Sequence, residues 1–269
     1  MKKYGIIGHP LGHTMSPTLH NWGFATKSIQ ATYGPWPTTP EELPAFMERF
    51  RNEPIHGLSI TIPHKEAVGE YADELTEAAK NAGAVNTLYR RGDKIIATNT
   101  DINGISDPVK ARALDIQSAL ILGAGGAARA AVYAMKEMGV SHIYISNRTE
   151  SRAQELADEF HINLTPWNDR ANLSFDLLIN STPLGMSGNL EALNPWPEET
   201  ILPANAYIFD LVYNPMETQL LKFAKRCGCK TISGLEMFIY QGLEQFRLWT
   251  GEELDAQKAR ELIEAKLNE

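Results

Sequence analysis

The chain has 269 residues, 43% of them hydrophobic, which suits two modest globular domains with a sizeable core. Its formal net charge of −8 argues against a general nucleic-acid-binding protein, and no basic run is long enough to reverse that sign locally. The first apolar stretch ends at Gly8, too short for a signal peptide, and no later segment could span a bilayer. We therefore expect a cytoplasmic protein that binds neither nucleic acid nor membranes.

Residues 1–103 alternate between strand-like and helix-like segments, which is typical of an α/β domain. The pattern predicts strands over 4–7, 31–34 and 58–62, helices that start at Pro17 and Pro40, and a helical stretch that runs through Lys80. The segment "AVNTLYRRGDKIIATNTD" then predicts a hairpin whose turn lies at residues 91–93. This hairpin would bring Asn86 close to Asn99 and Asp101.

The segment "GHPLGHTMSPTLHN" contains a helix start, with Ser16 as the expected cap and Pro17 as the first helical residue. If the preceding residues are extended, the hydroxyls of Thr14 and Ser16 project to the same side. Two hydroxyls beside a helix N-terminus form a small anion site that suits a carboxylate. Capping and turn formation alone are the alternative explanation.

Neither the histidines nor the cysteines predict a metal centre. His9, His13 and His20 have no nearby Cys, Asp or Glu that would complete a ligand set. Cys227 and Cys229 are separated by one glycine, which matches neither a redox pair nor a zinc pattern, so we expect reduced structural thiols.

The segment "GLSITIPHK" alternates between apolar and polar residues. The alternation predicts core positions at Leu58, Ile60 and Ile62 and outward positions at Ser59 and Thr61. Lys65 then follows at the carboxyl end of the strand, where open α/β sheets bind ligands, although an isolated lysine is usually a solvated surface group.

Asp101 has two possible roles. It could cap the helix that follows "NTD", which is the commoner task of such a residue. If it instead meets Lys65, its carboxylate favours the ammonium form, which would be ready to donate a proton to a carbonyl oxygen that receives a hydride. The spacing alone does not decide between these roles.

Residues 118–149 follow the order of a dinucleotide-binding unit. A buried strand over 119–122 leads into the G-x-G-x-x-A turn at 123–128, a helix over 127–138 and a second strand over 142–146. Gly123 would allow the tight turn, and Gly125 would let backbone N–H groups approach a pyrophosphate at the helix N-terminus.

The end of the second strand reads Asn147-Arg148-Thr149, where an acid would bind the ribose 2′-hydroxyl of NAD. A guanidinium offers a 2′-phosphate a planar fork of donors, so Arg148, with Arg152 one helical turn on, predicts NADP. The alternative is that Asn147 or Thr149 caps the helix that starts near Glu150 and that Arg148 is only solvated.

Strands over 175–179 and 207–211 complete a second domain, and the segments 234–251 and 252–268 are helical in pattern. These two C-terminal helices could pack against either domain. We expect boundaries of 1–103 for the substrate-binding and catalytic domain, 104–236 for the Rossmann-like NADP-binding domain, and 237–269 for the C-terminal helices.

Taken together, these motifs resemble the shikimate dehydrogenase family. The shared segments run through the whole chain in order: "GHPLGHTMSPTLHN", "TIPHKE", "AGAVNT", "NTD", "GAGGAAR", "NRT", "NSTPLGM", "DLVYNP", "GLEMFIYQG" and "FRLWTG". The resemblance implies a two-domain α/β fold whose C-terminal helices return to the first domain, with the active site in a cleft between the domains. It also implies reduction of 3-dehydroshikimate to shikimate with NADPH.

The resemblance further implies the roles of individual residues. Lys65 and Asp101 correspond to the catalytic pair. The substrate-binding positions are Thr14 and Ser16 for the carboxylate, and Thr61, Asn86, Asp101, Gln241 and Tyr213 for the rest of the molecule. The cofactor-binding positions are Gly123, Gly125, Gly126, Ala127, Asn147, Arg148, Thr149, Arg152, Gly234 and Met237. No metal is implied, and we expect a monomer or a homodimer.

Two positions depart from the family pattern, in which serine is usual at Thr14 and asparagine at Ser59. The extra methyl group of Thr14 keeps open a quinate/shikimate dehydrogenase of broader substrate and cofactor range. A non-catalytic NADP(H)-binding sensor is the alternative from another class, although it would have no use for Lys65. Glutamyl-tRNA reductases carry a similar nucleotide unit, but this chain is short and acidic and has no apparent catalytic cysteine.

Overall fold

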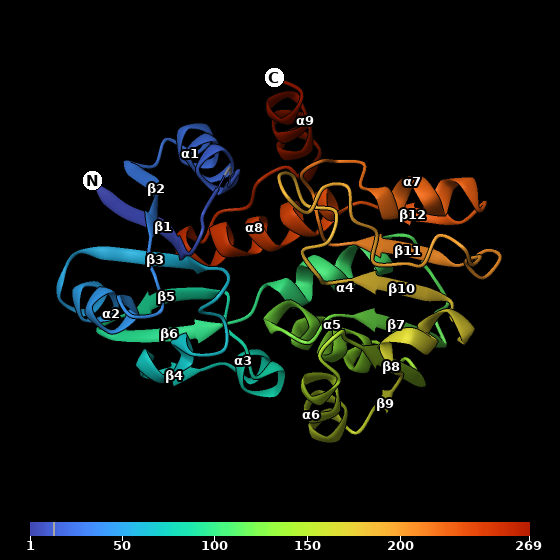
Figure 1. Ribbon diagram of the computed structural model, residues 1–269. Coiled ribbons are helices and arrows are strands. Elements are labelled where there is room, and N and C mark those ends of the chain that lie inside the picture. The colour runs from blue at the N-terminus through green and yellow to red at the C-terminus, as the bar shows by residue number, and fades with distance from the viewer. Residues whose placement is uncertain (13) are drawn as a thin grey trace. The chain divides into compact units, whose positions relative to one another are not determined.

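The structure is a computed structural model that describes residues 1–12 and 14–269. The chain divides into two compact units, residues 1–101 with 239–269 and residues 102–238. It leaves the first unit at the start of helix α4 (Asp101–Ala111) and returns to it within helix α8 (Gly234–Thr250). Each unit is built on a six-stranded sheet with helices packed against it, which confirms the predicted α/β fold (Figure 1).

The first unit has a mixed sheet with the strand order β2-β1-β3-β5-β6-β4. The strands are β1 (Lys2–Gly8), β2 (Ala31–Pro37), β3 (Ile55–Ile60), β4 (Glu74–Leu75), β5 (Thr87–Arg91) and β6 (Lys94–Thr98). β1 pairs in parallel with β2 and β3, whereas β5 pairs antiparallel with β3 and β6. The predicted hairpin is confirmed, because β5 and β6 are joined through Gly92, whose φ is +61°.

Helices cover both faces of this sheet. They are α1 (Ser16–Thr26), α2 (Leu43–Asn52), α3 (Glu77–Ala82) and α8, with the 3-10 helix η1 (Val68–Tyr71), while α9 (Ala256–Leu267) packs on α1. Phe50 of α2 and Ala79 of α3 pack against Leu58 on one face, and Phe246 and Trp249 of α8 lie in a second cluster on the other. Strand β3 is therefore enclosed on both faces and flanked by β1 and β5.

This enclosure corrects two predictions about the β3 segment. Ile62, predicted in the core, is 63% exposed, because β3 ends at Ile60 and the chain turns away. Ser59, predicted to face outward, is only 4% exposed, because α8 covers the face that a solvated sheet would leave open.

Two helix predictions for this unit were also inaccurate. The helix expected from Pro40 begins at Leu43, after a turn in which Glu42 accepts the Thr39 N–H at 2.9 Å. The helical stretch expected through Lys80 is divided into η1, β4 and α3, because β4 pairs in parallel with β6.

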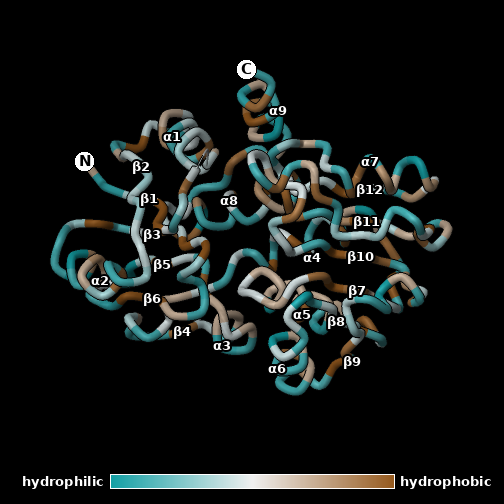
Figure 2. Tube along the Cα trace, viewed as in Figure 1, coloured by the Kyte–Doolittle hydropathy of each residue, from teal (hydrophilic) through white to brown (hydrophobic). Residues whose placement is uncertain are grey.

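The second unit has a parallel sheet with the strand order β12-β11-β10-β7-β8-β9. The strands are β7 (Ser118–Leu122), β8 (His142–Ser146), β9 (Asn163–Leu164), β10 (Leu177–Asn180), β11 (Tyr207–Asp210) and β12 (Lys230–Ile232). The central strands β7 and β10 carry short apolar runs, which Figure 2 colours brown. Such runs are expected for strands that are buried on both faces of a parallel sheet.

Helices of the second unit precede β7 and separate most of the later strands along the chain. They are α4, α5 (Gly126–Glu137), α6 (Glu150–Phe160), the 3-10 helix η2 (Trp167–Asn172) and α7 (Gln219–Arg226). Leu220 and Leu221 of α7 pack in one apolar cluster with Leu120 and Ile208 of the sheet. In the part of the chain that the structure describes, we find no helix of the length and apolarity needed to cross a bilayer.

The packing of α8 on β3 makes a stability prediction. A β-carbon added at Gly57 would lie 2.3 Å from the Nε1 atom of Trp249, a buried ring whose N–H donates to the Leu88 carbonyl at 3.0 Å. Because the ring is held in place, we expect Gly57→Ala to lower the free energy of unfolding by about 1–3 kcal/mol in urea denaturation.

Gly34 offers a matched control in the same sheet, because a β-carbon there would meet no atom within 4 Å. Gly34→Ala should change the free energy of unfolding by no more than about 0.5 kcal/mol. Equal effects of the two substitutions would contradict the proposed close packing at Gly57.

Candidate functional site

The sheet pairing of the first unit brings three chain segments to one edge of the sheet, meaning the row of strand ends that includes the carboxyl ends of β3 and β6. Ser59 of β3 lies opposite Thr87 of β5, and Thr87 lies opposite Thr98 of β6. Asn86 therefore lies between the two neighbouring strand ends: its carbonyl accepts the Ile60 N–H at 2.7 Å and its N–H donates to the Thr98 carbonyl at 3.1 Å. The segments after β3 and β6 and the segment before β5 meet at this edge.

Lys65 and Asp101 form a largely buried ion pair at this edge. The Lys65 Nζ atom lies 2.5 Å from Asp101 Oδ2, and the two side chains are 13% and 3% exposed. The other carboxylate oxygen accepts a hydrogen bond from Asn86 Nδ2 at 2.7 Å. The structure thus uses both oxygens of Asp101 in contacts with these side chains, and the predicted proximity of Asn86 and Asp101 is confirmed.

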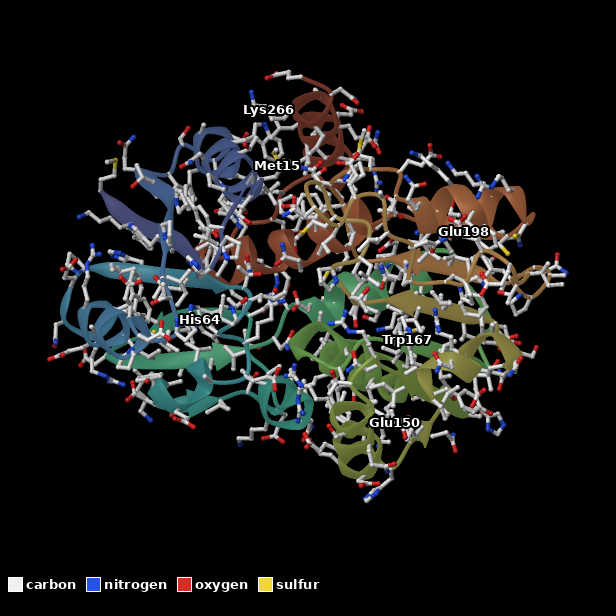
Figure 3. All side chains as sticks on the ribbon, in the orientation of Figure 1. Met15, His64, Glu150, Trp167, Glu198 and Lys266 are labelled. Atoms are coloured by element: carbon white, nitrogen blue, oxygen red, sulfur yellow. The ribbon has the colours of Figure 1, made fainter. Side chains whose placement is uncertain are left out.

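The turn that carries Lys65 is fixed from both sides. His64, labelled in Figure 3, is buried, and its Nε2–H donates to the Thr38 carbonyl at 2.7 Å. The carbonyl of Lys65 accepts the Val85 N–H at 2.7 Å. This anchoring role of His64 was not among the predictions, and its place next to Lys65 in the chain is the sequence signal for it.

Thr14 and Ser16 come together as expected, with their hydroxyl oxygens 3.3 Å apart. Ser16 is not the helix cap, however: it is the first residue of α1, and the cap position is occupied by Met15, which makes no side-chain cap bond (Figure 3). Thr14 Oγ1 instead accepts the Ser16 N–H at 3.3 Å. The pair follows β1, which is parallel to β3, so both strands direct their carboxyl ends to the same edge.

Thr61 and Gln241 are both partly buried. Thr61 directly follows β3, and its N–H donates to the Ile7 carbonyl at 3.0 Å. Gln241 lies on α8 one turn before Gln245, whose Nε2 donates to Thr87 Oγ1 at 2.9 Å. Residues four apart share a helix face, so Gln241 belongs to the stripe of α8 that faces the sheet.

His9 and His20 of the N-terminal segment lie in different surroundings. His20 is buried in an aromatic cluster, with its ring centroid 4.6 Å from that of Tyr33, and burial lowers the pKa of His20 to about 3. His9 is exposed, and His13 lies outside the described residues. Among residues 1–12 and 14–269, no three His, Cys, Asp or Glu side chains are grouped so that they could hold a metal ion.

The glycine-rich turn of the second unit has the geometry that its sequence predicts. Gly123 has a φ of +113°, and a β-carbon there would lie 2.4 Å from Ser181 Oγ. Gly125 is the cap residue of α5, and a β-carbon there would meet nothing within 4 Å. The first turn of α5, with Gly126 and Ala127, thus begins beside open space, and its first N–H groups have no carbonyl within the helix to bond.

The segment after β8 presents two exposed guanidinium groups, those of Arg148 and Arg152. No carboxylate among the described residues forms an ion pair with either of them. Thr149 is the cap residue of α6 but makes no side-chain cap bond, and Asn147 Nδ2 donates to the Thr149 carbonyl at 2.9 Å. Thr149 thus occupies the cap position that the alternative gave to it, although it makes no side-chain bond to the helix end.

Gly234, Met237 and Tyr213 also belong to the second unit. A β-carbon on Gly234 would lie 2.4 Å from the Val212 carbonyl oxygen, so close backbone packing accounts for the glycine. Tyr213 packs against Phe238 with ring centroids 4.8 Å apart, and Met237 is partly buried. These contacts fix the loop after β11 against the start of α8.

A second buried carboxylate, Asp210 at the end of β11, was not identified from the sequence. Its Oδ1 accepts hydrogen bonds from Asn180 Nδ2 at 2.8 Å and from the Val212 N–H at 3.1 Å, and its Oδ2 accepts one from Thr218 Oγ1 at 2.5 Å. Burial raises the pKa of Asp210 to about 6, although these three hydrogen bonds oppose the shift. The arrangement ties both ends of the loop between β11 and α7 to one side chain.

Comparison with protein families gives three consecutive matches along the chain. Residues 6–88 match the shikimate dehydrogenase substrate binding domain, and residues 109–184 match the shikimate / quinate 5-dehydrogenase family. Residues 234–264 match the shikimate 5'-dehydrogenase C-terminal domain. The chain is 56% identical to the shikimate dehydrogenase (NADP(+)) of Maridesulfovibrio salexigens, over 99% of this chain and 97% of that protein.

Solved structures agree in fold over nearly the whole chain. The shikimate 5-dehydrogenase of Thermus thermophilus, in complex with NADP(H) and shikimate, superposes with a TM-score of 0.89 at 34% identity, covering 98% of this chain and 99% of that one. The quinate dehydrogenase of Corynebacterium glutamicum, in complex with NAD, superposes with a TM-score of 0.89 at 28% identity, covering 98% of each chain.

The raised pKa of Asp210 predicts a pH-dependent contribution to stability. Between the ordinary value of 3.8 and about 6, the folded protein binds a proton at Asp210 that the unfolded chain releases. This contribution is fully present below 3.8 and is lost as the pH rises through about 6. Urea denaturation across this range should therefore show a weaker decline of stability with rising pH in Asp210→Asn than in the unsubstituted protein. The same slope in both proteins would contradict the assignment.

Proposed function

Because the chain belongs to the shikimate dehydrogenase family, we propose that it catalyses the reversible, NADPH-dependent reduction of 3-dehydroshikimate to shikimate. The observation that supports this most directly is the buried ion pair between Lys65 and Asp101, with Asn86 on the second carboxylate oxygen. Such a pair holds an ammonium group in fixed geometry at the edge of a sheet. The relatives named above as shikimate dehydrogenases support the substrate.

Lys65 supplies the proton in this proposal. Bound NADPH supplies a hydride for the carbonyl carbon of the substrate, and the carbonyl oxygen that gains negative charge needs a proton at the same time. The Lys65 ammonium donates that proton, and the contact with Asp101 holds Nζ in position. In the reverse direction the same Nζ accepts the proton from the hydroxyl group.

The hydroxyls of Thr14 and Ser16 bind the substrate carboxylate, since they lie 3.3 Å apart beside the first turn of α1. The ring hydroxyl groups of the substrate bind to the polar groups at the same edge of the sheet. These groups belong to Thr61, Asn86, Asp101 and Gln241. Tyr213 of the second unit contributes to the binding of substrate in this proposal.

The second unit binds the cofactor. The open space beside Gly125 and the N-terminal turn of α5, which includes Gly126 and Ala127, fits a pyrophosphate, and Gly123 allows the turn. Two exposed guanidinium groups, with Asn147 where an acid would bind a ribose hydroxyl, fit a 2′-phosphate. The 2′-phosphate contacts are Arg148, Arg152, Asn147 and Thr149, and Gly234 and Met237 line the nicotinamide end.

The remaining expectations from the sequence belong to the same proposal. The protein acts in the cytoplasm on a small molecule, as a monomer or a homodimer, and binds no nucleic acid. The resemblance to shikimate dehydrogenases places the reaction in the route to chorismate and the aromatic amino acids.

The proposed substrate and cofactor are tested together by initial rates at 340 nm, where NADPH absorbs, on shikimate or quinate with NADP or NAD. We expect strong preference for shikimate with NADP. Comparable turnover of quinate, or free use of NAD, would instead assign the protein to the quinate/shikimate branch of the family. No turnover of any pair would leave the NADP(H)-binding sensor as the better explanation.

Arg148→Ala should raise the KM for NADPH far more than the KM for NADH, because only NADPH carries the phosphate that the guanidinium binds. Arg226→Ala, which removes an exposed arginine from α7 of the same unit, is the control and should leave both constants unchanged. If Arg148→Ala affects NADPH and NADH equally, Arg148 does not select the cofactor.

Lys65→Ala should lower kcat by roughly 10²–10⁴, the usual scale for the loss of a general acid, and leave the binding of NADPH nearly unchanged. Lys80→Ala, which removes an exposed lysine paired with Glu77 in the same unit, is the control. Unchanged turnover in Lys65→Ala would remove Lys65 from the proposed mechanism.

A further inference from the structure

A continuous series of hydrogen bonds leads through the interior of the first unit to Asp101. The donors and acceptors in order are Tyr33 Oη to Ser59 Oγ at 2.6 Å, Ser59 Oγ to Gln245 Oε1 at 2.8 Å, Gln245 Nε2 to Thr87 Oγ1 at 2.9 Å, Thr87 Oγ1 to Asn86 Oδ1 at 2.7 Å, and Asn86 Nδ2 to Asp101 Oδ1 at 2.7 Å. The series ends on the carboxylate that holds Lys65 Nζ.

The series has a direction because each hydroxyl group carries one proton. Ser59 accepts from Tyr33 and donates to Gln245 Oε1, so the amide of Gln245 presents its Nε2 donor to Thr87. Thr87 Oγ1 accepts this bond and directs its own proton to Asn86 Oδ1. With its oxygen held in this way, the Asn86 amide directs Nδ2 to Asp101.

The intermediate side chains, those of Ser59, Thr87, Asn86 and Gln245, are all buried. In such surroundings water does not easily reach a polar atom that loses its partner. Each hydroxyl and amide proton of the series therefore stays directed at the acceptor named above. A reversed Asn86 amide would place Oδ1 against a carboxylate oxygen, and this repulsion would disturb the position of Asp101. The orientation of one amide group therefore controls the geometry of the ion pair.

Gln245 is the one residue of the series that α8 contributes, and it bonds both β3, through Ser59, and β5, through Thr87. Asn86 has further support from Thr100, whose backbone N–H donates to Asn86 Oδ1 at 2.7 Å and whose Oγ1 accepts a hydrogen bond from Asn86 Nδ2 at 2.9 Å. The loss of Gln245 should therefore weaken the orientation of Asn86 without abolishing it.

We propose that Gln245 is a positioning residue for the reaction, acting through Thr87 and Asn86 on Asp101 and hence on Lys65, with Ser59 fixing the orientation of its amide. This inference rests on the proposed function for its kinetic consequences. The physical claim, that Gln245 fixes the orientation of the Asn86 side chain, concerns the protein without ligands.

The kinetic test replaces Gln245 by leucine, which fills similar volume without hydrogen bonds. We expect Gln245→Leu to lower kcat by roughly 10-fold, within the range for a reacting group held slightly out of place, with the KM for NADPH unchanged. Ser59→Ala should give a smaller decrease in kcat, and Ser59→Thr, which keeps the hydroxyl group, should restore it. Tyr4→Phe is the control, because it removes a buried hydroxyl of the same unit that bonds the Trp249 carbonyl and lies outside the series.

A spectroscopic test needs no turnover. The side-chain amide resonances of Asn86 in ¹⁵N-labelled protein, assigned by their absence in Asn86→Ala, should shift in Gln245→Leu and in Ser59→Ala but not in Tyr4→Phe. If Gln245→Leu does not fold, Ser59→Ala, which deletes a single oxygen, serves for both measurements.

The outcomes separate this inference from the proposed function. Unchanged Asn86 resonances in both variants would overturn the positioning role, as would an unchanged kcat in an active enzyme. A kcat loss in Tyr4→Phe equal to that in Gln245→Leu would show a general effect of core destabilisation and would also overturn it. If the unsubstituted protein does not convert shikimate, the proposed function fails, and the resonances alone decide whether Gln245 orients Asn86.

Discussion

The burial of Asp101 is the constraint on which the first unit depends. A carboxylate that is 3% exposed is stable as an ion only when a cation and hydrogen-bond donors surround it. Lys65 provides the cation and Asn86 provides the donor. Together with Asp101, these residues come from segments next to three different strands. The strand order β3-β5-β6 meets this demand because the antiparallel pairing of neighbours returns the chain twice to the same edge. The sheet topology thus brings together the residues of the ion pair.

The enclosure of β3 connects the packing of this unit with its proposed chemistry. Gly57 leaves room for the Trp249 ring, and Ser59, on the same face, bonds Gln245 of the same helix. A helix packed this closely on the strand excludes solvent from the polar groups beneath it, so each of them needs a partner within the protein. These partners form the hydrogen-bonded series that reaches Asp101. Residues that stabilise the core therefore also orient the groups proposed to react.

The second unit combines exposed positive groups with one buried carboxylate. Its parallel sheet leaves a helix N-terminus and two exposed guanidinium groups free of acidic partners among the described residues, which favours an anionic ligand. Asp210, the last residue of β11, is buried and accepts hydrogen bonds from Asn180 and Thr218, so its carboxylate does not reach the surface. The negative group thus holds the loop after β11 in place.

The sequence by itself determined the α/β fold, the glycine turn, the hairpin and the residues proposed to react, because these depend on periodicity, on glycine conformations and on motifs that are local in the chain. The tertiary structure alone decided that Asp101 meets Lys65, that Ser59 is buried and that Ile62 is exposed. Only the tertiary structure shows that Gln245 of α8 bonds Ser59 and Thr87. Alternation along one strand shows which residues share a face, but whether that face meets solvent or a helix depends on α8, which lies far away in sequence. Contacts between distant segments are set by packing and by the need to satisfy buried polar groups, and no local pattern carries that information.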